Sequence, residues 1–143
     1  MIWHTVPDLA TLARAHENSA VATLGIAFTA VGDDFLEGRM PVDGRTVQPM
    51  GILHGGASVL LAETLGSCAA SHCVDPAREV CVGLDINANH LRAVRSGAVT
   101  GRATPLHLGR STQVWSIDIR NPQERRVCIA RLTMAVIAKE RAP

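Results

Sequence analysis

The chain has 143 residues, of which 47% are hydrophobic and 19% charged, a composition that predicts one globular domain and excludes a disordered chain. Fourteen basic against thirteen acidic residues leave a net charge of +1, and aromatic residues make up only 3%. We therefore expect no nucleic-acid partner and no membrane partner, because the chain lacks both a strong positive field and the aromatic platforms on which bases stack.

The first half of the chain predicts a short helix and two strands before a loop. Residues Asp8–Glu17 place Leu9, Leu12 and Ala13 on one stripe, which is typical of an amphipathic helix. Residues Phe35–Val42 alternate between apolar and charged side chains, as a half-buried strand does. Residues Asp43–Gly51 are rich in glycine, proline and polar residues and predict a loop.

The central stretch predicts one long helix over residues His54–Cys73. Apolar residues occur nearly all round this helix, which indicates that it is buried. The stretch between residues 52 and 70 contains His54, Glu63 and three glycines, so we interpret it as a core helix and not as a membrane span.

The remainder of the chain shows only strand patterns. The predicted strands are Val80–Asn89, Ala98–Thr104, Thr112–Ile119 and Val127–Ile137, with a turn at Asn121–Glu124. Consecutive strands joined by short turns pair antiparallel. We expect a single α+β domain over residues 1–143, in which an antiparallel sheet of five to six strands wraps around the one long helix.

The cysteines and the first residues indicate the compartment. The four cysteines are Cys68, Cys73, Cys81 and Cys128. They show no zinc-ligand spacing and lie in apolar stretches, so we expect free thiols, no metal and no disulfide framework. The first dozen residues lack the basic and then apolar pattern of a signal peptide, which predicts a cytoplasmic protein.

Two features of the long helix indicate chemistry. Gly55 and Gly56 stand where the helix starts, so a ligand can approach backbone N–H groups that lack intrahelical partners and carry the positive end of the helix dipole. Such a site suits a carbonyl oxygen that is becoming an oxyanion. Glu63 lies in the middle of the same helix among leucines and alanines, and buried carboxyl groups of this kind are frequent at active sites.

Each of these residues also has a purely structural explanation. The glycine pair is compatible with a tight junction between loop and helix, and Glu63 with a solvated gap in the helix face. His54 is compatible with a helix cap, and His90 with a core histidine whose hydrogen bonds are satisfied. The functional interpretation gains weight because histidine, glycine pair and glutamate share one element.

The spacing of Gly55 and Glu63 predicts a dimer. The two residues are eight positions apart, which is roughly 12 Å along a helix. A reacting carbonyl must lie about 3 Å from its oxyanion donor and close to its nucleophile or base. One helix cannot meet both conditions, whereas two antiparallel copies related by a two-fold axis can. We therefore expect active sites at a dimer interface.

Neighbouring polar residues are candidates for supporting roles. Ser67 follows Glu63 by one turn and Thr64 is adjacent, so either hydroxyl can orient the carboxylate or a water. Gln48 precedes the helix and can donate its amide to a substrate carbonyl. Two basic clusters, Asn89–Arg95 at a strand end and His107–Ser111 in a turn, suit phosphate oxygens, although solvated loop charges explain them equally well.

The sequence resembles the hotdog-fold acyl-CoA thioesterases over nearly its whole length. The resemblance is carried by QPMGILHGGASVLLAETLGS, by VGLDINANHLR and by PLHLGR. It is strongest to the branch that contains 1,4-dihydroxy-2-naphthoyl-CoA thioesterase and the enterobactin-pathway proofreading thioesterase. Met50 and Thr64 depart from the Phe and Ser usual in close relatives, and both lie near the expected acyl pocket.

The resemblance implies roles for individual residues. Glu63 is the implied nucleophile or general base, Gly55 donates its N–H to the thioester carbonyl, Gln48 and His54 assist from the same subunit, and Ser67 accompanies Glu63 on the partner. The residues implied in binding the CoA part are Gly83, His90, Leu91, Arg92, Ala93, His107, Leu108, Gly109, Arg110 and Ser111. A homotetramer built as a dimer of dimers is also implied.

We therefore expect a thioesterase that hydrolyses an acyl-CoA or aroyl-CoA thioester and needs no cofactor, since CoA belongs to the substrate. An acyl carrier protein is an alternative partner as the donor of the acyl group, although Arg92, Arg95 and Arg110 favour CoA with its extra phosphate. A dehydratase acting on 3-hydroxyacyl thioesters and a non-catalytic module that binds acyl-CoA are the alternative functions.

Overall fold

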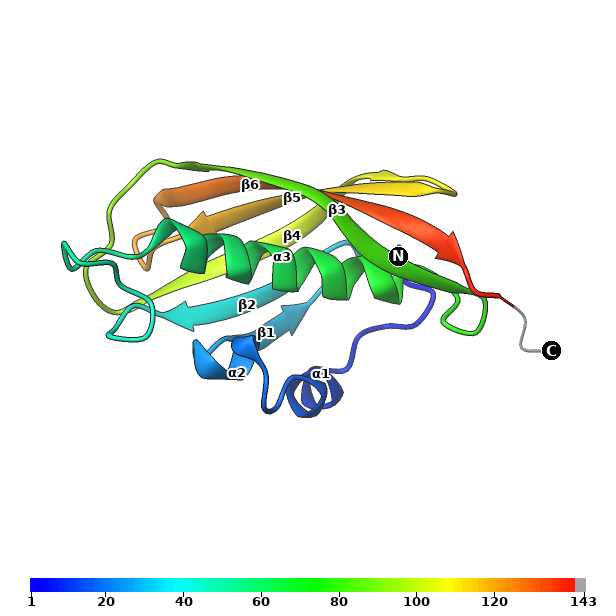
Figure 1. Cartoon of the computed structure of the whole chain (residues 1–143), viewed down its shortest axis with the longest axis horizontal. Coiled ribbons are helices and arrows are strands. Elements are labelled where there is room, and N and C mark those ends of the chain that lie inside the picture. The colour runs from blue at the N-terminus through cyan, green and yellow to red at the C-terminus, as the bar shows by residue number, and fades with distance from the viewer. Residues whose placement is uncertain (141–143) are drawn as a thin grey trace.

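One long helix, α3 (Gly55–His72), lies in the concave face of a six-stranded antiparallel sheet (Figure 1). The computed structural model describes residues 1–140. The strands are β1 (Ala27–Val31), β2 (Leu36–Pro41), β3 (Glu79–His90), β4 (Ala98–Leu108), β5 (Thr112–Arg120) and β6 (Arg126–Ala138). Their order across the sheet is β1-β2-β4-β5-β6-β3, so β1 and β3 form the two edges.

The predicted architecture is confirmed, with two differences in the elements. The amphipathic helix is present as α1 (Leu9–Ala15), capped by the Asp8 side chain, but a second short helix, α2 (Ala20–Thr23), has no counterpart in the prediction. The fourth strand, β4, continues past the predicted end at Thr104 to Leu108. The pairing register between β4 and β5 shifts between Pro105 and His107. A bulge there accommodates a proline that has no N–H to donate.

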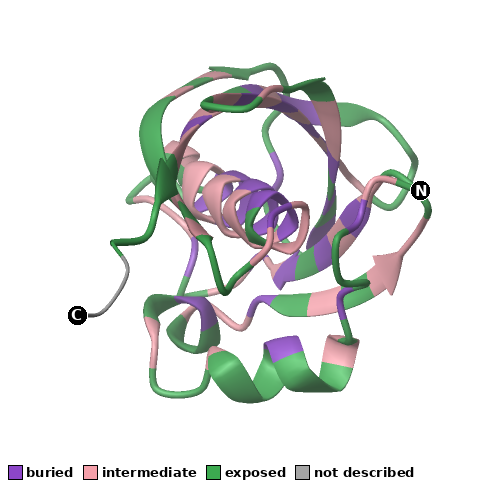
Figure 2. Cartoon of the chain, turned by 90° about the vertical axis from the view of Figure 1, so that its right-hand side faces the viewer, coloured by how far each residue is buried: buried purple, intermediate pink, exposed green. Residues whose placement is uncertain are grey.

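The central helix is not buried all round, which corrects the expectation from its composition. Figure 2 shows purple, buried residues on the side of α3 that faces the sheet and pink, half-buried residues on the other side. The buried residues are Ala57, Ser58, Leu61, Ala62, Leu65, Gly66, Ala69 and Ala70. Leu60, Glu63 and Ser67 are only half-buried, so the side of the helix that carries them lacks a complete cover within one chain.

Leu65 anchors the helix to the sheet. A β-carbon at Gly38 of β2 would lie 2.8 Å from the Leu65 Cδ2 atom, and one at Gly101 of β4 would lie 2.9 Å from Cδ1. The Leu65 side chain is fully buried and occupies the notch left by these two glycines on adjacent strands. Leu65 therefore fixes how closely helix and sheet approach.

Replacing Leu65 with alanine will leave a cavity in this notch and lower the free energy of unfolding by about 2–5 kcal/mol. Urea unfolding followed by circular dichroism measures the change. Leu106→Ala is the matched control, because Leu106 is 56% exposed and its loss should change stability by less than about 0.5 kcal/mol. Equal losses in both variants would contradict the anchoring role.

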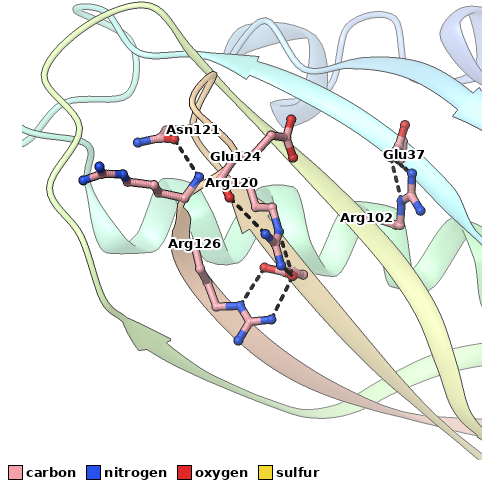
Figure 3. A network of polar contacts seen from close by, with 8 residues as sticks. Glu37, Arg102, Arg120, Asn121, Glu124 and Arg126 are labelled. Carbon is pink, nitrogen blue, oxygen red and sulfur yellow. Dashed lines mark hydrogen bonds and ion pairs between the residues drawn. The ribbon is translucent and has the colours of Figure 1, made fainter.

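The convex face of the sheet carries a network of ion pairs (Figure 3). Asp118 accepts hydrogen bonds from Arg126 and from Arg120, with contacts of 2.8–3.0 Å, and Glu37 pairs with Arg102 at 2.6 Å. Partial burial alone would raise the pKa of Asp118, but the two arginines outweigh it and hold this pKa below its usual value. Because these carboxylates already have partners, we interpret this face as a solvated surface.

The two edges of the sheet differ. Helix α1 packs against β1, and the pairing of β1 with β2 contains an irregularity between Phe28 and Ala30. Strand β3 pairs on one side only, with β6. Its apolar residues Val80, Val82 and Leu84 are 40–63% exposed. In the described part of the chain, none of the helices has the length and hydropathy of a membrane-spanning segment.

Candidate active site

The start of α3 leaves one backbone donor free. His54 is the N-cap, and its Nδ1 atom accepts the N–H of Gly56 at 2.8 Å. The N–H groups of Ala57 and Ser58 donate to the His54 carbonyl. Within residues 1–140 the Gly55 N–H has no hydrogen-bond acceptor. The structure thus shows the capping role for His54, and that cap leaves Gly55 as the available donor at the positive end of the helix.

Gln48 is held beside this donor by the turn that precedes the helix. The turn is closed by hydrogen bonds between Gln48 and Ile52 and between Gly51 and Gln48, and Gly51 adopts the left-handed conformation with φ of 76°. The Gln48 side-chain oxygen accepts the N–H of Met50. Because the oxygen is engaged, the amide nitrogen is the end of Gln48 that remains free to donate.

Gly55 and Gln48 open into one cavity of about 400 Å³. The residues that line it are Gln48, Ile52, Leu53, Gly55, Ser58, His90, Leu91, Arg92, Ala93 and Val127. The His90 ring lies across Gly55, since a β-carbon at Gly55 would be 2.8 Å from the His90 Nε2 atom. The structure therefore brings the predicted oxyanion donor together with the first predicted CoA cluster, His90 to Ala93.

Glu63 opens into a different cavity of about 290 Å³, lined by His16, Val21, Leu60, Glu63, Thr64 and Ser67. We call this cavity the Glu63 pocket. Glu63 is half-buried, which corrects the expectation of a fully buried carboxyl group. Its side chain reaches β3, where a β-carbon at Gly83 would lie 3.0 Å from Glu63 Oε1. Gly83 thus leaves room for the carboxylate against the strand backbone.

The two hydroxyl groups beside Glu63 differ in freedom. The Thr64 hydroxyl donates to the Leu60 carbonyl at 2.7 Å, so its proton is not available to the carboxylate. The Ser67 hydroxyl has only a sulfur contact, 3.7 Å from Met134 Sδ. Because sulfur is a weak acceptor, Ser67 is the hydroxyl that can turn toward a substrate, a water or Glu63.

The second predicted CoA cluster lies at the other end of the sheet. His107 and Leu108 belong to β4 and not to the turn, which corrects the prediction, because the strand continues beyond Pro105. Gly109, Arg110 and Ser111 form the turn between β4 and β5 (yellow in Figure 1). All but Gly109 of these five residues are exposed.

Pairing registers give the separation of the two CoA clusters. The Ser111 carbonyl accepts the N–H of Val136, and Val136 pairs with Cys81 near the start of β3, whereas His90 is the last residue of β3. Nine residues of strand at about 3.3 Å each place the clusters roughly 30 Å apart. Gly83, and with it Glu63, therefore lies toward the same end as the His107–Ser111 cluster.

The candidate residues consequently fall into two groups within one chain. Gln48, Gly55 and His90 line one cavity, Glu63 and Ser67 line another, and neither cavity contains both Gly55 and Glu63. Met50 lines neither cavity and is 76% exposed.

His16 follows α1 and lines the Glu63 pocket, although it is not among the residues predicted from the sequence. Its place at the end of a short surface helix gave no signal of this position.

Comparison with known proteins gives the family. The model of the thioesterase superfamily matches residues 50–128, which is more than half of the chain. The chain therefore belongs to the thioesterase superfamily, and it is a thioester hydrolase with the hotdog fold.

Individual relatives agree with this assignment. The chain is 50% identical over 137 residues to the 1,4-dihydroxy-2-naphthoyl-CoA hydrolase of Escherichia coli, and the alignment covers 96% of this chain and 100% of that protein. A solved thioesterase of Haemophilus influenzae has a TM-score of 0.93 at 55% identity and covers 96% of both chains. A glutamine-to-alanine variant of a Pseudomonas aeruginosa thioesterase has a TM-score of 0.96 at 52% identity, covering 97% of this chain and 100% of that one. The predicted family, fold and class of enzyme are confirmed.

Proposed function

We propose that the protein hydrolyses an acyl-CoA or aroyl-CoA thioester at sites shared between two subunits. The observation that carries the proposal is the division of the candidate residues: Gly55 and Glu63 stand on one helix but open into separate cavities. In the proposed site, Gly55 and Gln48 of one subunit face Glu63 and Ser67 of the other. A two-fold axis then creates two equivalent sites.

The open edge of β3 supports this dimer. Its backbone is unpaired on one side, and exposed Val82 and Leu84 would lose contact with water if a second β3 paired with it. A two-fold axis beside β3 also runs the two α3 helices antiparallel, which the spacing of Gly55 and Glu63 requires. Further pairing of dimers into a homotetramer is part of the proposal and is supported by the family resemblance alone.

The proposed chemistry uses the free donors of the site. The Gly55 N–H and the Gln48 amide stabilise the negative charge that develops on the thioester oxygen. Glu63 either takes a proton from water, whose oxygen attacks the carbonyl carbon, or attacks that carbon itself and forms an anhydride that water then cleaves. In both routes the carbon–sulfur bond breaks, the acid is released, and the proton passes to the thiolate of CoA.

The same arrangement supplies a binding site for the CoA nucleotide. The His90–Ala93 cluster of one subunit and the His107–Ser111 cluster of the other approach each other in an antiparallel dimer, although they lie far apart in one chain. Arg92 and Arg110 are charged donors that suit phosphate oxygens. The name of the Escherichia coli relative supports an aromatic acyl group, and Met50 is a candidate to contact it.

Thiol release from a substrate panel tests the proposal. The panel contains aromatic CoA thioesters, straight-chain acyl-CoA thioesters and acyl carrier protein thioesters, with kcat/KM measured for each. We expect release of free CoA, with carrier-protein thioesters the poorer substrates. Formation of an enoyl product without thiol release would instead identify a dehydratase, and binding without turnover would identify a non-catalytic module.

A further inference from the structure

His16 lines two cavities. One is the Glu63 pocket, and the other is a cavity of about 160 Å³ between the first two helices and β1, which we call the far cavity. The far cavity is lined by Ala13, His16, Glu17, Val21, Ala22, Ile26, Ala27 and Phe28. His16 and Val21 are the residues that line both cavities. The two cavities therefore adjoin at His16 and Val21.

Three elements hold this ring in place. Its Nδ1 atom is 2.8 Å from the Leu12 carbonyl in α1, and its Nε2 atom is 3.5 Å from the Cys68 Sγ in α3. The Phe28 ring of β1 lies against it, with centroids 5.1 Å apart and a tilt of 56°. The ring therefore has contacts from α1, α3 and β1.

The hydrogen-bond pattern defines the state of the ring. A carbonyl oxygen only accepts, so Nδ1 carries a proton, and in the neutral ring Nε2 is then the acceptor. Burial raises the pKa of the Cys68 thiol to about 12, which keeps it protonated and able to donate to Nε2. Both nitrogens of a neutral His16 are thus satisfied by the protein and neither needs a ligand.

We propose that His16 sets the length of the acyl group that the enzyme accepts. The inference deepens the proposed function, because it takes the Glu63 pocket as the acyl pocket. The ring closes the end of that pocket, so compact acyl groups fit and longer chains are excluded. Without the ring, the pocket would continue past Val21 into the far cavity.

The lining of the far cavity suits a hydrocarbon chain. Val21 and Ile26 are buried and Phe28 is half-buried, which provides an apolar surface, and Glu17 is the charged residue of the lining. A saturated acyl chain that entered would bury methylene groups there and gain favourable transfer free energy with each. A polar acyl group would gain no matching partner from these three side chains.

The test is the variant His16→Ala, assayed by thiol release on saturated acyl-CoA substrates from butanoyl-CoA to hexadecanoyl-CoA. We expect the ratio of kcat/KM for the longest to that for the shortest substrates to rise by at least about tenfold over the wild type. His16→Phe keeps a ring in the same place without the two nitrogen contacts, so it should retain the wild-type profile.

Two further variants test whether the changed chain-length profile comes from loss of the His16 ring or from a general destabilisation of α1. His72→Ala is the matched control: His72 also bonds a backbone carbonyl, that of Cys68 at 2.8 Å, but lines neither cavity. Its chain-length profile should not change. Ala13 is exposed but lines the far cavity, so the double variant His16→Ala with Ala13→Leu places a larger side chain there, one that helices tolerate, and should reverse the increase in the long-to-short kcat/KM ratio. If the increased ratio of kcat/KM for long to short substrates persists in the double variant, the proposal is overturned.

The outcome also distinguishes this proposal from the proposed function. If Glu63→Gln abolishes hydrolysis at every chain length while His16→Ala keeps the wild-type profile, the role of His16 is refuted and the catalytic assignment stands. If Glu63→Gln hydrolyses all substrates normally, the acyl pocket is misassigned and both proposals fail.

Discussion

Replacing Glu63 with alanine or glutamine should lower kcat by about 10²–10⁴-fold, the range that a positioned general base contributes. Binding of CoA should persist, because the residues proposed to hold CoA keep their positions. The loss of kcat is expected because Glu63 is the carboxylate of the pocket that also holds Ser67. Stopped-flow thiol release gives kcat, and isothermal titration with CoA gives the affinity.

The matched control for this loss is Glu37→Gln. Glu37 is a glutamate of the same chain that pairs with Arg102 on the convex face of the sheet, opposite the face that holds α3. Its variant should turn over at the wild-type rate. Near-normal turnover by the Glu63 variants would remove Glu63 from the mechanism, and loss in both glutamate variants would point to a general effect on folding.

A mixture of two inactive variants should recover activity. Gly55→Pro removes the free N–H at the first position of α3, where proline is otherwise well tolerated, and should lower kcat by about 10²–10³-fold. A heterodimer of a Gly55→Pro chain and a Glu63→Ala chain contains one site that carries both substitutions and one site that carries neither. Random exchange makes half of the dimers heterodimers, each with one intact site in two, so the mixture should regain about one quarter of wild-type activity.

Two controls make this complementation specific. Gly55→Ala keeps the N–H and adds only a β-carbon, which would meet the movable end of the His90 side chain, so it should lose less activity than the proline variant. Mixing Glu63→Ala with Glu63→Gln should recover nothing, because every site then lacks the carboxylate. Recovery in that mixture, or none with the proline variant after verified subunit exchange, would refute the shared site.

The fold could be predicted from the sequence because its pattern is regular. Alternation over residues 80–89 and 127–137 defines two long strands, and one long apolar helix requires a sheet around it. The extension of β4 could not be predicted because Pro105 is unfavourable in a strand, and only pairing with β5 shows that a bulge absorbs it. The short α2 carries too few residues for a periodic pattern.

The candidate site was predictable where one element carries it. Gly55 and Glu63 both lie on α3, and their spacing along the helix predicts that they cannot reach the same carbonyl within one chain. The structure places them in different cavities. The contact between Glu63 and Gly83 and the position of His16 depend on how α1, α3 and β3 pack together. Such contacts between distant segments leave no mark in local periodicity.

The unequal edges of the sheet bear on how the protein avoids forming fibres. If both edges were bare, each molecule could add to the next without end, as amyloid strands do. Here α1 packs against β1 and an irregularity interrupts its pairing, whereas β3 is unpaired on one side along its length. A molecule with a single unpaired edge strand can pair with only one other molecule through that strand. Association through β3 therefore stops at a dimer.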